Sequence, residues 1–285
     1  MPVPIQKQIQ EKIVKPLEEI KDFLKEKKEI ALVLGSGGAR GPAHIGVINI
    51  LKKNNIPIDL VIGTSIGALV GGLYCAGCIE EFIEKEKEIT PRKLGRIFIT
   101  RPTREGLTSG EKIDILVKNF LDNKKIEDLV IPLIIIATDL NTGKEVVITK
   151  GSLVEAIHAS IAIPGLIAPV HHDHQLLVDG GIIDPIPINL ARKLAKKAII
   201  VDVLPELKEM RKRQNTNLIL FDIIADTINI MEHKILKILP RKKEVLIKLD
   251  ILDIGNLQYH RMKEAIKAGE KAALKALPKI KEILE

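Results

Sequence analysis

The chain has 285 residues, of which 46% are hydrophobic and 28% are charged, a balance that allows a sizeable core and excludes wholesale disorder. Its length suits one large α/β domain or two small ones. The net charge of +7 indicates either a solvated lysine-rich surface or attraction to an anionic surface such as a membrane. Nucleic acid is not an expected partner, because only 2% of the residues are aromatic and no nucleic-acid-binding motif is present.

The start of the chain and its two cysteines bear on the compartment. Residues 1–15 (MPVPIQKQIQEKIVK) are too charged for the apolar core of a secretory signal. A single pair of cysteines, Cys75 and Cys78, does not suit a disulfide-stapled secreted domain. We therefore expect a cytoplasmic protein, with peripheral contact with an anionic membrane as an open alternative. Apolar residues recur at steps of three and four within 1–28, which predicts an amphipathic helix that either packs on the domain or lies on a membrane surface.

Short apolar runs then alternate with helical patterns. In chain order they predict a strand at Ile30–Leu34, a helix at Ala43–Leu51, a strand at Ile58–Ile62, a helix at Ile66–Ala76, mostly helical structure at 80–127 with a looser stretch near 91–106, strands at Pro132–Ala137 and Glu145–Ile148, a helix at Leu153–Ser160, a hairpin at Pro169–Val178 with Asp173 at its turn, a strand at Ala198–Val203, a helix at 216–239, a strand at 244–251 and a helix at about 258–285. Strands that alternate with helices predict right-handed βαβ units around a parallel sheet.

One stretch could be mistaken for a membrane span. Leu60–Ile79 contains no charged side chain and is long enough to cross a bilayer. It also contains five glycines, together with Thr64 and Ser65, and it starts with a β-rich run. We therefore predict a buried strand, a turn and a helix here rather than a transmembrane helix.

The turn within this stretch has the pattern of a nucleophile elbow. Gly63–Gly67 spells G-T-S-I-G, a G-x-S-x-G between a predicted strand and a predicted helix. A sharp turn there lifts the Ser65 hydroxyl out of the sheet, and the positive end of the following helix favours developing negative charge. The pattern makes Ser65 a candidate nucleophile, with a plain tight βα turn as the alternative.

A second strand-to-helix turn, Gly35–Gly41 (GSGGARG), is rich in glycine. Its backbone N–H groups can point into one concavity and hold an anion. A dinucleotide-binding loop is one interpretation, since Gly35 begins a G-x-G-x-x-G, but Arg40 occupies the sixth position. An oxyanion hole needs only oriented N–H donors and fits the loop as well.

A third motif, Asp179-Gly180-Gly181, follows the second strand of the predicted hairpin. A carboxylate at a strand end, followed by two glycines, lies where a base could meet a serine. An ordinary β-turn aspartate is the alternative. The segment Ala159–Pro164 (ASIAIP) precedes this motif along the chain.

Taken in this order, the three motifs and the Ala159–Pro164 segment resemble patatin-like phospholipases. The pattern of that family is a glycine-rich oxyanion loop with a basic residue, then GxSxG, then SxAxP, then DG[AG]. The resemblance runs from about Ile30 to about Val203. One departure is Ser36, where many members have glycine. Because Ser36 lies outside the two central glycines, it is not expected to remove the hole.

The resemblance implies a three-layer α/β/α sandwich with a mainly parallel central sheet. It also implies that Ser65 is the nucleophile and Asp179 the general base of a dyad that cleaves carboxylic esters of lipids through an acyl-serine intermediate. The implied oxyanion donors are the amides of Gly37, Gly38, Ala39 and Arg40. No metal or organic cofactor is implied.

The family pattern and the remaining sequence divide the chain without a linker. We expect a helical segment at 1–28, a catalytic domain at 29–205 and a C-terminal helical part at 206–285 that packs on the same domain. Two other functions stay open: a nucleotide-binding protein that uses the loop at 35–41, and a catalytically inactive adaptor at a membrane surface. The sequence leaves the oligomeric state and the exact lipid substrate open.

Two clusters resemble metal sites. The expected hairpin tip contains His171, His172 and His174, and we expect them to be solvated, since alternate residues of a strand point opposite ways. Cys75 and Cys78 have the spacing of redox and zinc motifs. No second pair of ligands lies near them in the sequence, so we expect buried small residues.

No histidine is expected in the catalytic machinery. Hydrolases with a G-x-S-x-G elbow usually follow the serine with an acid and then a histidine. After Asp179 the chain has only His233 and His260. Both lie in predicted helical or near-terminal regions outside the segment that resembles the family, and neither has the loop-after-strand setting that a triad histidine needs.

Overall fold

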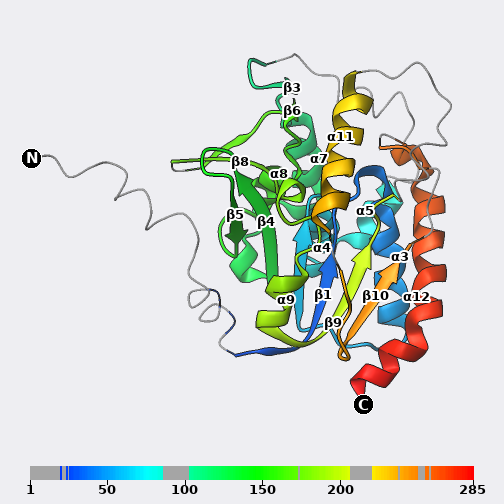
Figure 1. Cartoon of the computed structure of the whole chain (residues 1–285). Helices are drawn as coiled ribbons and strands as arrows, with labels where there is room; N and C mark the ends of the chain where they lie inside the picture. The colour runs from blue at the N-terminus through cyan, green and yellow to red at the C-terminus, as the bar shows by residue number, and fades with distance from the viewer. Residues whose placement is uncertain are drawn as a thin grey trace, which may run out of the picture.

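The computed structural model describes residues 26–85, 103–172, 174–205, 220–236, 238–249, 254–256 and 258–285, together with Ile20 and Leu24. Within this part, one mixed β-sheet lies between two layers of helices (Figure 1). The three-layer α/β/α sandwich expected from the sequence is therefore confirmed.

Five parallel strands form the larger part of the sheet. In spatial order they are β10 (Glu244–Lys248), β9 (Ala195–Asp202), β1 (Lys28–Leu34), β2 (Leu60–Thr64) and β4 (Leu133–Asp139). Strands β2 and β4 are buried at every residue, which is typical of parallel strands that are covered on both faces. The apolar runs of the sequence predicted all five, with ends shifted by a few residues.

An antiparallel part adjoins β4. Strand β5 (Lys144–Ile148) pairs with one edge of β4, and β8 (Gln175–Asp179) pairs with the other edge. Strand β7 (Val170–His172) pairs with β8 and ends this side of the sheet. The hairpin predicted at Pro169–Val178 is therefore confirmed.

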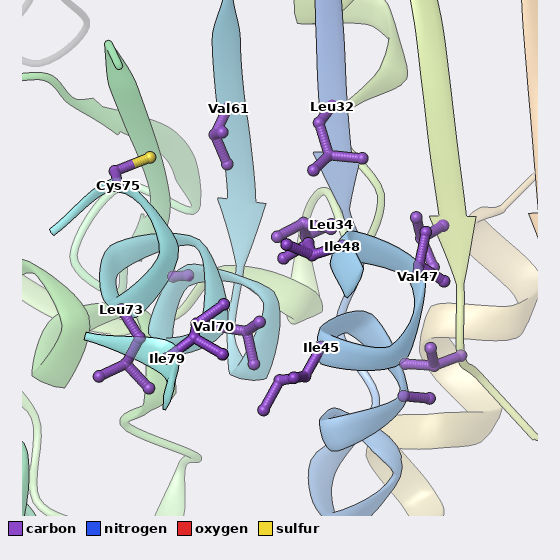
Figure 2. Close-up of a cluster of buried hydrophobic side chains, with 14 of the residues drawn as sticks. Leu32, Leu34, Ile45, Val47, Ile48, Val61, Val70, Leu73, Cys75 and Ile79 are labelled. Carbon is purple, nitrogen blue, oxygen red and sulfur yellow. The ribbon is translucent and has the colours of Figure 1, made fainter. Parts of the chain in front are cut away.

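One face of the sheet carries the larger core. The helices of the described part are α3 (Pro42–Lys53), α4 (Ile66–Cys75), α5 (Ile79–Lys85), α7 (Glu111–Leu121), α8 (Leu153–Ile161), α9 (Ile188–Leu194), α11 (Leu220–Ile235) and α12 (Met262–Leu284). Helices α3, α4 and α12 pack against one face. Figure 2 shows Leu32 and Leu34 of β1 on this side, close to Ile45 and Ile48 of α3 and to Val70 of α4.

The opposite face has a smaller, separate core. Ala31 and Val33, which alternate with the residues above, point to this side, where α9 packs on β1 and β9. Ile20 and Leu24 are buried in the same cluster. Otherwise the helix predicted at 1–28 lies mainly outside the described residues, as do most of the looser stretch near 91–106 and the hairpin residue Asp173.

Several short elements were not predicted from the sequence. They are η1 (Gly38–Arg40), η2 (Ile126–Asp128), η3 (Gly180–Ile182), η4 (Tyr259–Arg261), helix α9, and a two-stranded parallel sheet of β3 (Gly106–Thr108) and β6 (Gly165–Ile167). Helix α9 has seven residues and each of the two strands has three. Segments this short do not display a hydrophobic period.

The uncharged stretch Leu60–Ile79 forms β2, a turn and α4, and ends as α5 begins. In the described part of the chain, no single helix is long and apolar enough to cross a membrane. Helices α4 and α5 reach the required length and composition only as a pair, and they are bent by 115° relative to each other.

Candidate active site

Ser65 lies in the turn between β2 and α4. Strand β2 ends at Thr64 and α4 begins at Ile66, so one residue makes the whole turn. The backbone of Ser65 has φ 55° and ψ −124°, a conformation that costs a residue with a side chain about 1–3 kcal/mol and is common at functional sites. This is the strained strand-to-helix geometry of a nucleophile elbow.

The glycines on either side of Ser65 allow this turn to pack closely. A Cβ atom at Gly67 would lie 2.1 Å from the carbonyl oxygen of Leu34, and one at Gly63 would lie 2.6 Å from the carbonyl oxygen of Gly67. Both contacts are to backbone atoms, which cannot move aside as a flexible side chain can. The start of α4 therefore presses directly against the end of β1, where the Gly35–Gly41 loop begins.

Asp179 meets Ser65 because β2 and β8 share one edge of β4. Thr64, the last residue of β2, pairs with Ile136 of β4, and Asp179, the last residue of β8, pairs with the next residue, Ala137. The two strands approach from opposite directions and end beside each other. As a result the Ser65 Oγ donates a hydrogen bond of 2.6 Å to Asp179 Oδ2.

The segment Ala159–Pro164 holds both members of this pair. The Ser160 hydroxyl accepts a hydrogen bond of 2.8 Å from the Ser65 amide and donates one of 2.6 Å to the carbonyl of Ile136. Two residues later, the Ala162 carbonyl accepts a 2.9 Å hydrogen bond from the Asp179 amide. Ser160 therefore links the backbone of Ser65 to β4 at the point where β2 ends. The family resemblance identified this segment in the sequence, but it did not predict the hydrogen bonds of Ser160 and Ala162.

Burial sets the acidity of Asp179. Its side chain is 3% exposed, and burial raises the pKa of the carboxyl to about 6. Hydrogen bonds from the Ser65 hydroxyl and from the Gly181 amide, the latter of 2.7 Å to Oδ1, act in the opposite direction. At neutral pH Asp179 is therefore mainly a carboxylate, but one that accepts a proton far more readily than an exposed aspartate.

The glycine-rich loop presents two unused amides. The Ala39 amide donates to the carbonyl of Asn256 at 3.3 Å, and the Arg40 amide donates to the carbonyl of Gly37 at 3.2 Å. Within the described residues, the amides of Gly37 and Gly38 have no hydrogen-bond acceptor. Of the four amides that the family resemblance implied, only these two remain available to an oxyanion.

Arg40 fixes the loop rather than pointing into the pocket. Its side chain is 1% exposed, and Nε donates to the carbonyl of Val203 at 3.2 Å while Nη1 donates to the carbonyl of Ile254 at 2.7 Å. Nη2 donates to the side-chain oxygen of Asn256 at 3.0 Å and to that of Asn229 at 3.4 Å. The guanidinium thus joins η1 to the end of β9, to α11 and to the segment before α12.

The inner face of α11 carries buried polar side chains, Asn229 and Glu232, that the sequence patterns did not predict as part of the site. Ala225, Asn229 and Glu232 are buried at steps of four and three. Glu232 accepts a 2.5 Å hydrogen bond from the Ser36 hydroxyl. The available signal was that polar residues occupy the inward positions of an apolar helical pattern, where a core helix has aliphatic ones.

An apolar pocket opens onto the Ser65–Asp179 pair. Ser36, Gly38 and Glu232 also line it. Most of the remaining wall is apolar, apart from Asn229, Asn256 and the hydroxyl of Tyr259, and its aliphatic members include Ile45, Leu69, Leu73, Val117, Ile163 and Ile228. The Ser65 hydroxyl, the Asp179 carboxylate and Gly38 therefore line a cavity that suits a hydrocarbon chain.

The histidines and cysteines that resemble metal sites do not converge. His171 contacts Glu105 at 3.3 Å and His172 contacts Glu155 at 3.4 Å, on exposed side chains. Across the described ranges, no group of three histidine, cysteine, aspartate or glutamate side chains could hold a metal ion. Cys75 and Cys78 are both buried and free.

The histidines that follow Asp179 have other surroundings. His233 Nε2 contacts the carbonyl of Pro205 at 2.6 Å, and His260 is exposed on η4. In the described part of the chain, neither contacts Ser65, whose hydroxyl bonds to Asp179.

The chain is similar in sequence to known proteins. Residues 32–192, more than half of the chain, match the family model for patatin-like phospholipase. An uncharacterised NTE family protein of Mycobacterium tuberculosis is 46% identical over 159 residues, which cover 56% of this chain and 44% of that protein. A second NTE family protein of that organism is 32% identical over 279 residues, covering 88% of this chain and 46% of the relative. The chain thus spans less than half the length of these relatives.

The fold of the chain is also similar to that of a solved structure. The crystal structure of VipD from Legionella pneumophila superimposes with a TM-score of 0.52 at 14% identity, covering 89% of this chain and 67% of that one. At this identity the match bears on the fold alone, and it agrees with the three-layer architecture of the described residues.

Proposed function

Because the chain belongs to the patatin-like phospholipase family, we propose that it is a serine acyl hydrolase that cleaves carboxylic esters of lipids through an acyl-Ser65 intermediate. The observation that carries the proposal is the 2.6 Å hydrogen bond from the Ser65 hydroxyl to the buried carboxylate of Asp179, at the mouth of an apolar pocket.

The first half-reaction begins with the proton of Ser65. Asp179 Oδ2 accepts this proton as Oγ forms a bond to the ester carbonyl carbon, and the carbonyl oxygen takes up negative charge. The raised pKa of Asp179, about 6, makes the carboxylate a better base than an exposed one. The intermediate collapses as the bond to the alkoxy group breaks and Asp179 returns the proton to the leaving oxygen. The acyl group stays on Ser65.

The second half-reaction repeats these steps with water. Asp179 accepts a proton from a water molecule, whose oxygen bonds to the acyl carbon and forms a second oxyanion. Collapse breaks the bond to Ser65 Oγ, which recovers its proton from Asp179, and the fatty acid leaves. We assign the oxyanion donors to the amides of Gly37 and Gly38, since those of Ala39 and Arg40 are engaged elsewhere.

The pocket supports a lipid-derived acyl chain as the substrate group. Aliphatic side chains from α3, α4, α7 and α11 line it, and burial of a hydrocarbon contributes about 0.8 kcal/mol per CH₂. We also propose that residues 206–285 form one domain with 29–205. Support for this comes from β10, which pairs with β9, and from α11, which supplies part of the pocket wall.

Labelling with a fluorophosphonate tests the function directly. We expect a covalent adduct on Ser65, located by mass spectrometry, and turnover of medium-chain and long-chain esters. Ser65→Ala should abolish labelling and lower kcat about a thousandfold or more, as removal of a nucleophile does in other serine hydrolases. A variant that keeps more than about a tenth of the wild-type esterase activity would exclude Ser65 as the nucleophile.

Labelling, together with vesicle-binding and nucleotide-binding measurements, separates the other two candidate functions. An inactive adaptor would bind vesicles, leave the ester intact and remain unlabelled. A nucleotide-binding protein would bind nucleotide with unchanged affinity after Ser65→Ala, since the loop at 35–41 would be intact.

A further inference from the structure

A second buried carboxyl lies beside the Ser65–Asp179 pair. Glu232 projects from the inner face of α11 and is 2% exposed. Its Oε1 accepts a 2.5 Å hydrogen bond from the hydroxyl of Ser36, the residue just before the free amides of Gly37 and Gly38. The amide of Ser36 is itself tied to the carbonyl of Pro185 at 2.9 Å. Glu232 therefore holds one end of the loop that carries the proposed oxyanion donors.

Glu232 also lies close to Asp179. A Cβ atom at Gly181 would lie 2.1 Å from Glu232 Oε1, 3.0 Å from Ser36 Oγ and 3.1 Å from Asp179 Oδ1. Three side-chain oxygens thus surround a single glycine, and only glycine leaves room for them. When two carboxyls lie this close and this deeply buried, the charge on each opposes ionisation of the other.

The surroundings of Glu232 favour its neutral form. Burial is the main cause, and the charges of Asp179 on β8 and Asp202 on β9 act in the same direction; together they raise the pKa of Glu232 to about 8. The hydrogen bond from Ser36 and the charge of Arg40 on η1 act in the opposite direction. At neutral pH the pair therefore carries one negative charge, and it resides on Asp179, whose pKa is about 6.

We propose that Glu232 is a positioning residue of the acyl-transfer site: its hydrogen bond with Ser36 holds the loop that carries the Gly37 and Gly38 amides, and its neutral state keeps a second negative charge away from the place where the oxyanion forms. The proposal rests on the proposed roles of Ser65 and Asp179. An ionised Glu232 would oppose the developing oxyanion and would raise the pKa of the base.

The consequence is an activity window with two limits. The rate rises as Asp179 ionises, through about pH 6, and falls as Glu232 ionises, through about pH 8. A single ionisation that inactivates the site lowers the rate about a hundredfold at two pH units above its pKa.

The second-order rate of fluorophosphonate labelling of Ser65 measures this window without a known natural substrate. We would compare the wild type with Glu232→Gln from about pH 5 to about pH 10. Glutamine has the same shape but does not ionise, so the decline at high pH should disappear while the rise at low pH remains. An unchanged decline in Glu232→Gln overturns the proposal.

Glu244→Gln is the matched control. Glu244 is also buried and hydrogen-bonded, but it pairs with Arg192 at 2.7 Å at the start of β10, the end of the strand far from the elbow. Burial raises the pKa of Glu244, but the hydrogen bonds and charges of Arg192 and Arg241 outweigh burial and lower it, so the substitution should leave the decline at high pH in place. If the control also removed the decline, the effect would not be specific to Glu232 and the proposal would fail.

Ser36→Ala independently tests the direction in which the decline at high pH shifts. The Ser36 hydrogen bond lowers the pKa of Glu232, so its loss should move the decline to higher pH without moving the rise that reports Asp179. If Glu232→Gln does not fold, this shift still tests whether ionisation of Glu232 causes the decline at high pH. An unmoved decline, or one that moves to lower pH, contradicts the proposal.

A failure to label Ser65 would refute the proposed function and would leave the neutral state of Glu232 to be tested separately. Measurements of stability against pH provide that test. The pKa of Glu232 is raised from 4.5 to about 8. The stability that its neutral form contributes is therefore full below about pH 4.5 and is lost as the pH rises through 8. Between these limits the urea midpoint should fall more in the wild type than in Glu232→Gln. Equal falls would show that Glu232 is not held neutral.

Discussion

At Ser65 the backbone adopts a conformation that a serine takes up only at an energetic cost. Its φ of 55° is held by the bond from its amide to Ser160 and by the close packing of Gly67 on Leu34. In return the hydroxyl points at Asp179 rather than into the sheet. Strain that surrounding contacts enforce in this way orients a nucleophile before substrate arrives.

Asp179→Asn tests whether this carboxylate is the base. An amide of the same shape cannot accept the proton, so kcat should fall about a thousandfold or more while the fold stays intact by circular dichroism. His233→Ala and His260→Ala should each retain most of the activity, because these side chains lie elsewhere. If either histidine substitution cost as much as Ser65→Ala in a folded protein, the enzyme would use a triad.

Ser160→Ala tests the support behind the elbow. It leaves the Ser65 amide and the Ile136 carbonyl without their partner, and each buried unsatisfied group costs about 1–3 kcal/mol. We expect a lower melting temperature and a kcat reduced about tenfold, with little change in KM, because the orientation of the nucleophile is affected.

Ser152→Ala is the control for that experiment. Ser152 caps the same helix, α8, by accepting a hydrogen bond from the Glu155 amide at 3.3 Å, and loss of such a cap costs about 1 kcal/mol. Stability should fall while kcat stays near the wild-type value. Equal effects of the two substitutions on kcat would mean that Ser160 acts through stability alone.

At the scale of elements, β4 organises the site. Because β2 and β8 end side by side on its edge, the proposed nucleophile and the proposed base come from strands of opposite direction. The antiparallel hairpin of β7 and β8 is therefore part of the active-site architecture. Helix α4 begins at this point, and its N-terminal end adds positive potential near Ser65.

Gly67→Ala tests how tightly α4 is placed against β1. The new methyl would lie 2.1 Å from the carbonyl oxygen of Leu34, so helix or strand must move. We expect a loss of about 3 kcal/mol in the free energy of unfolding and a large loss of activity. Gly77→Ala, where the methyl meets nothing within 4 Å but φ is 72°, should cost about 1 kcal/mol and leave activity unchanged. Normal activity in Gly67→Ala would contradict the close packing.

At the scale of the whole molecule, residues from the C-terminal third complete a site whose motifs lie in the first two thirds. Arg40 reaches Ile254 and Asn256, and α11 contributes pocket wall and Glu232. A truncation after Val203 would remove Glu232, the partner of the Ser36 hydroxyl, and three of the partners of the Arg40 guanidinium, Asn229, Ile254 and Asn256. The segment that resembles the family most clearly is therefore not a self-sufficient active site.

The net charge of +7 leads to a prediction about lipid surfaces. Each lysine or arginine near an anionic membrane contributes about 1 kcal/mol, and salt screens this attraction within a Debye length of about 10 Å at 0.1 M. We expect sedimentation with phosphatidylserine vesicles that weakens as salt is added, and weaker binding to phosphatidylcholine vesicles. Equal binding to both would remove the electrostatic contribution.

The sequence by itself determined the features that depend on neighbouring residues. Apolar runs between glycines predicted the strands, and the order Gly35–Gly41, Gly63–Gly67, Asp179-Gly180-Gly181 was enough to recognise the family. The turn at Ser65 could be predicted locally, because the small residues on either side of it mark a sharp turn, although the contacts with Ser160 and Leu34 that hold its backbone are distant in sequence. Short elements such as α9 were not predicted, because seven residues are too few to show a hydrophobic period.

Tertiary structure alone decided which groups meet and how acidic they are. Ser65 and Asp179 are 114 positions apart, and Ser36 and Glu232 are 196 positions apart. Register on β4 brings the first pair together, and the packing of α11 on η3 places Glu232 beside them. A pKa depends on burial and on nearby charges, and both arise only when distant segments pack, so no local pattern could assign Glu232 its neutral state.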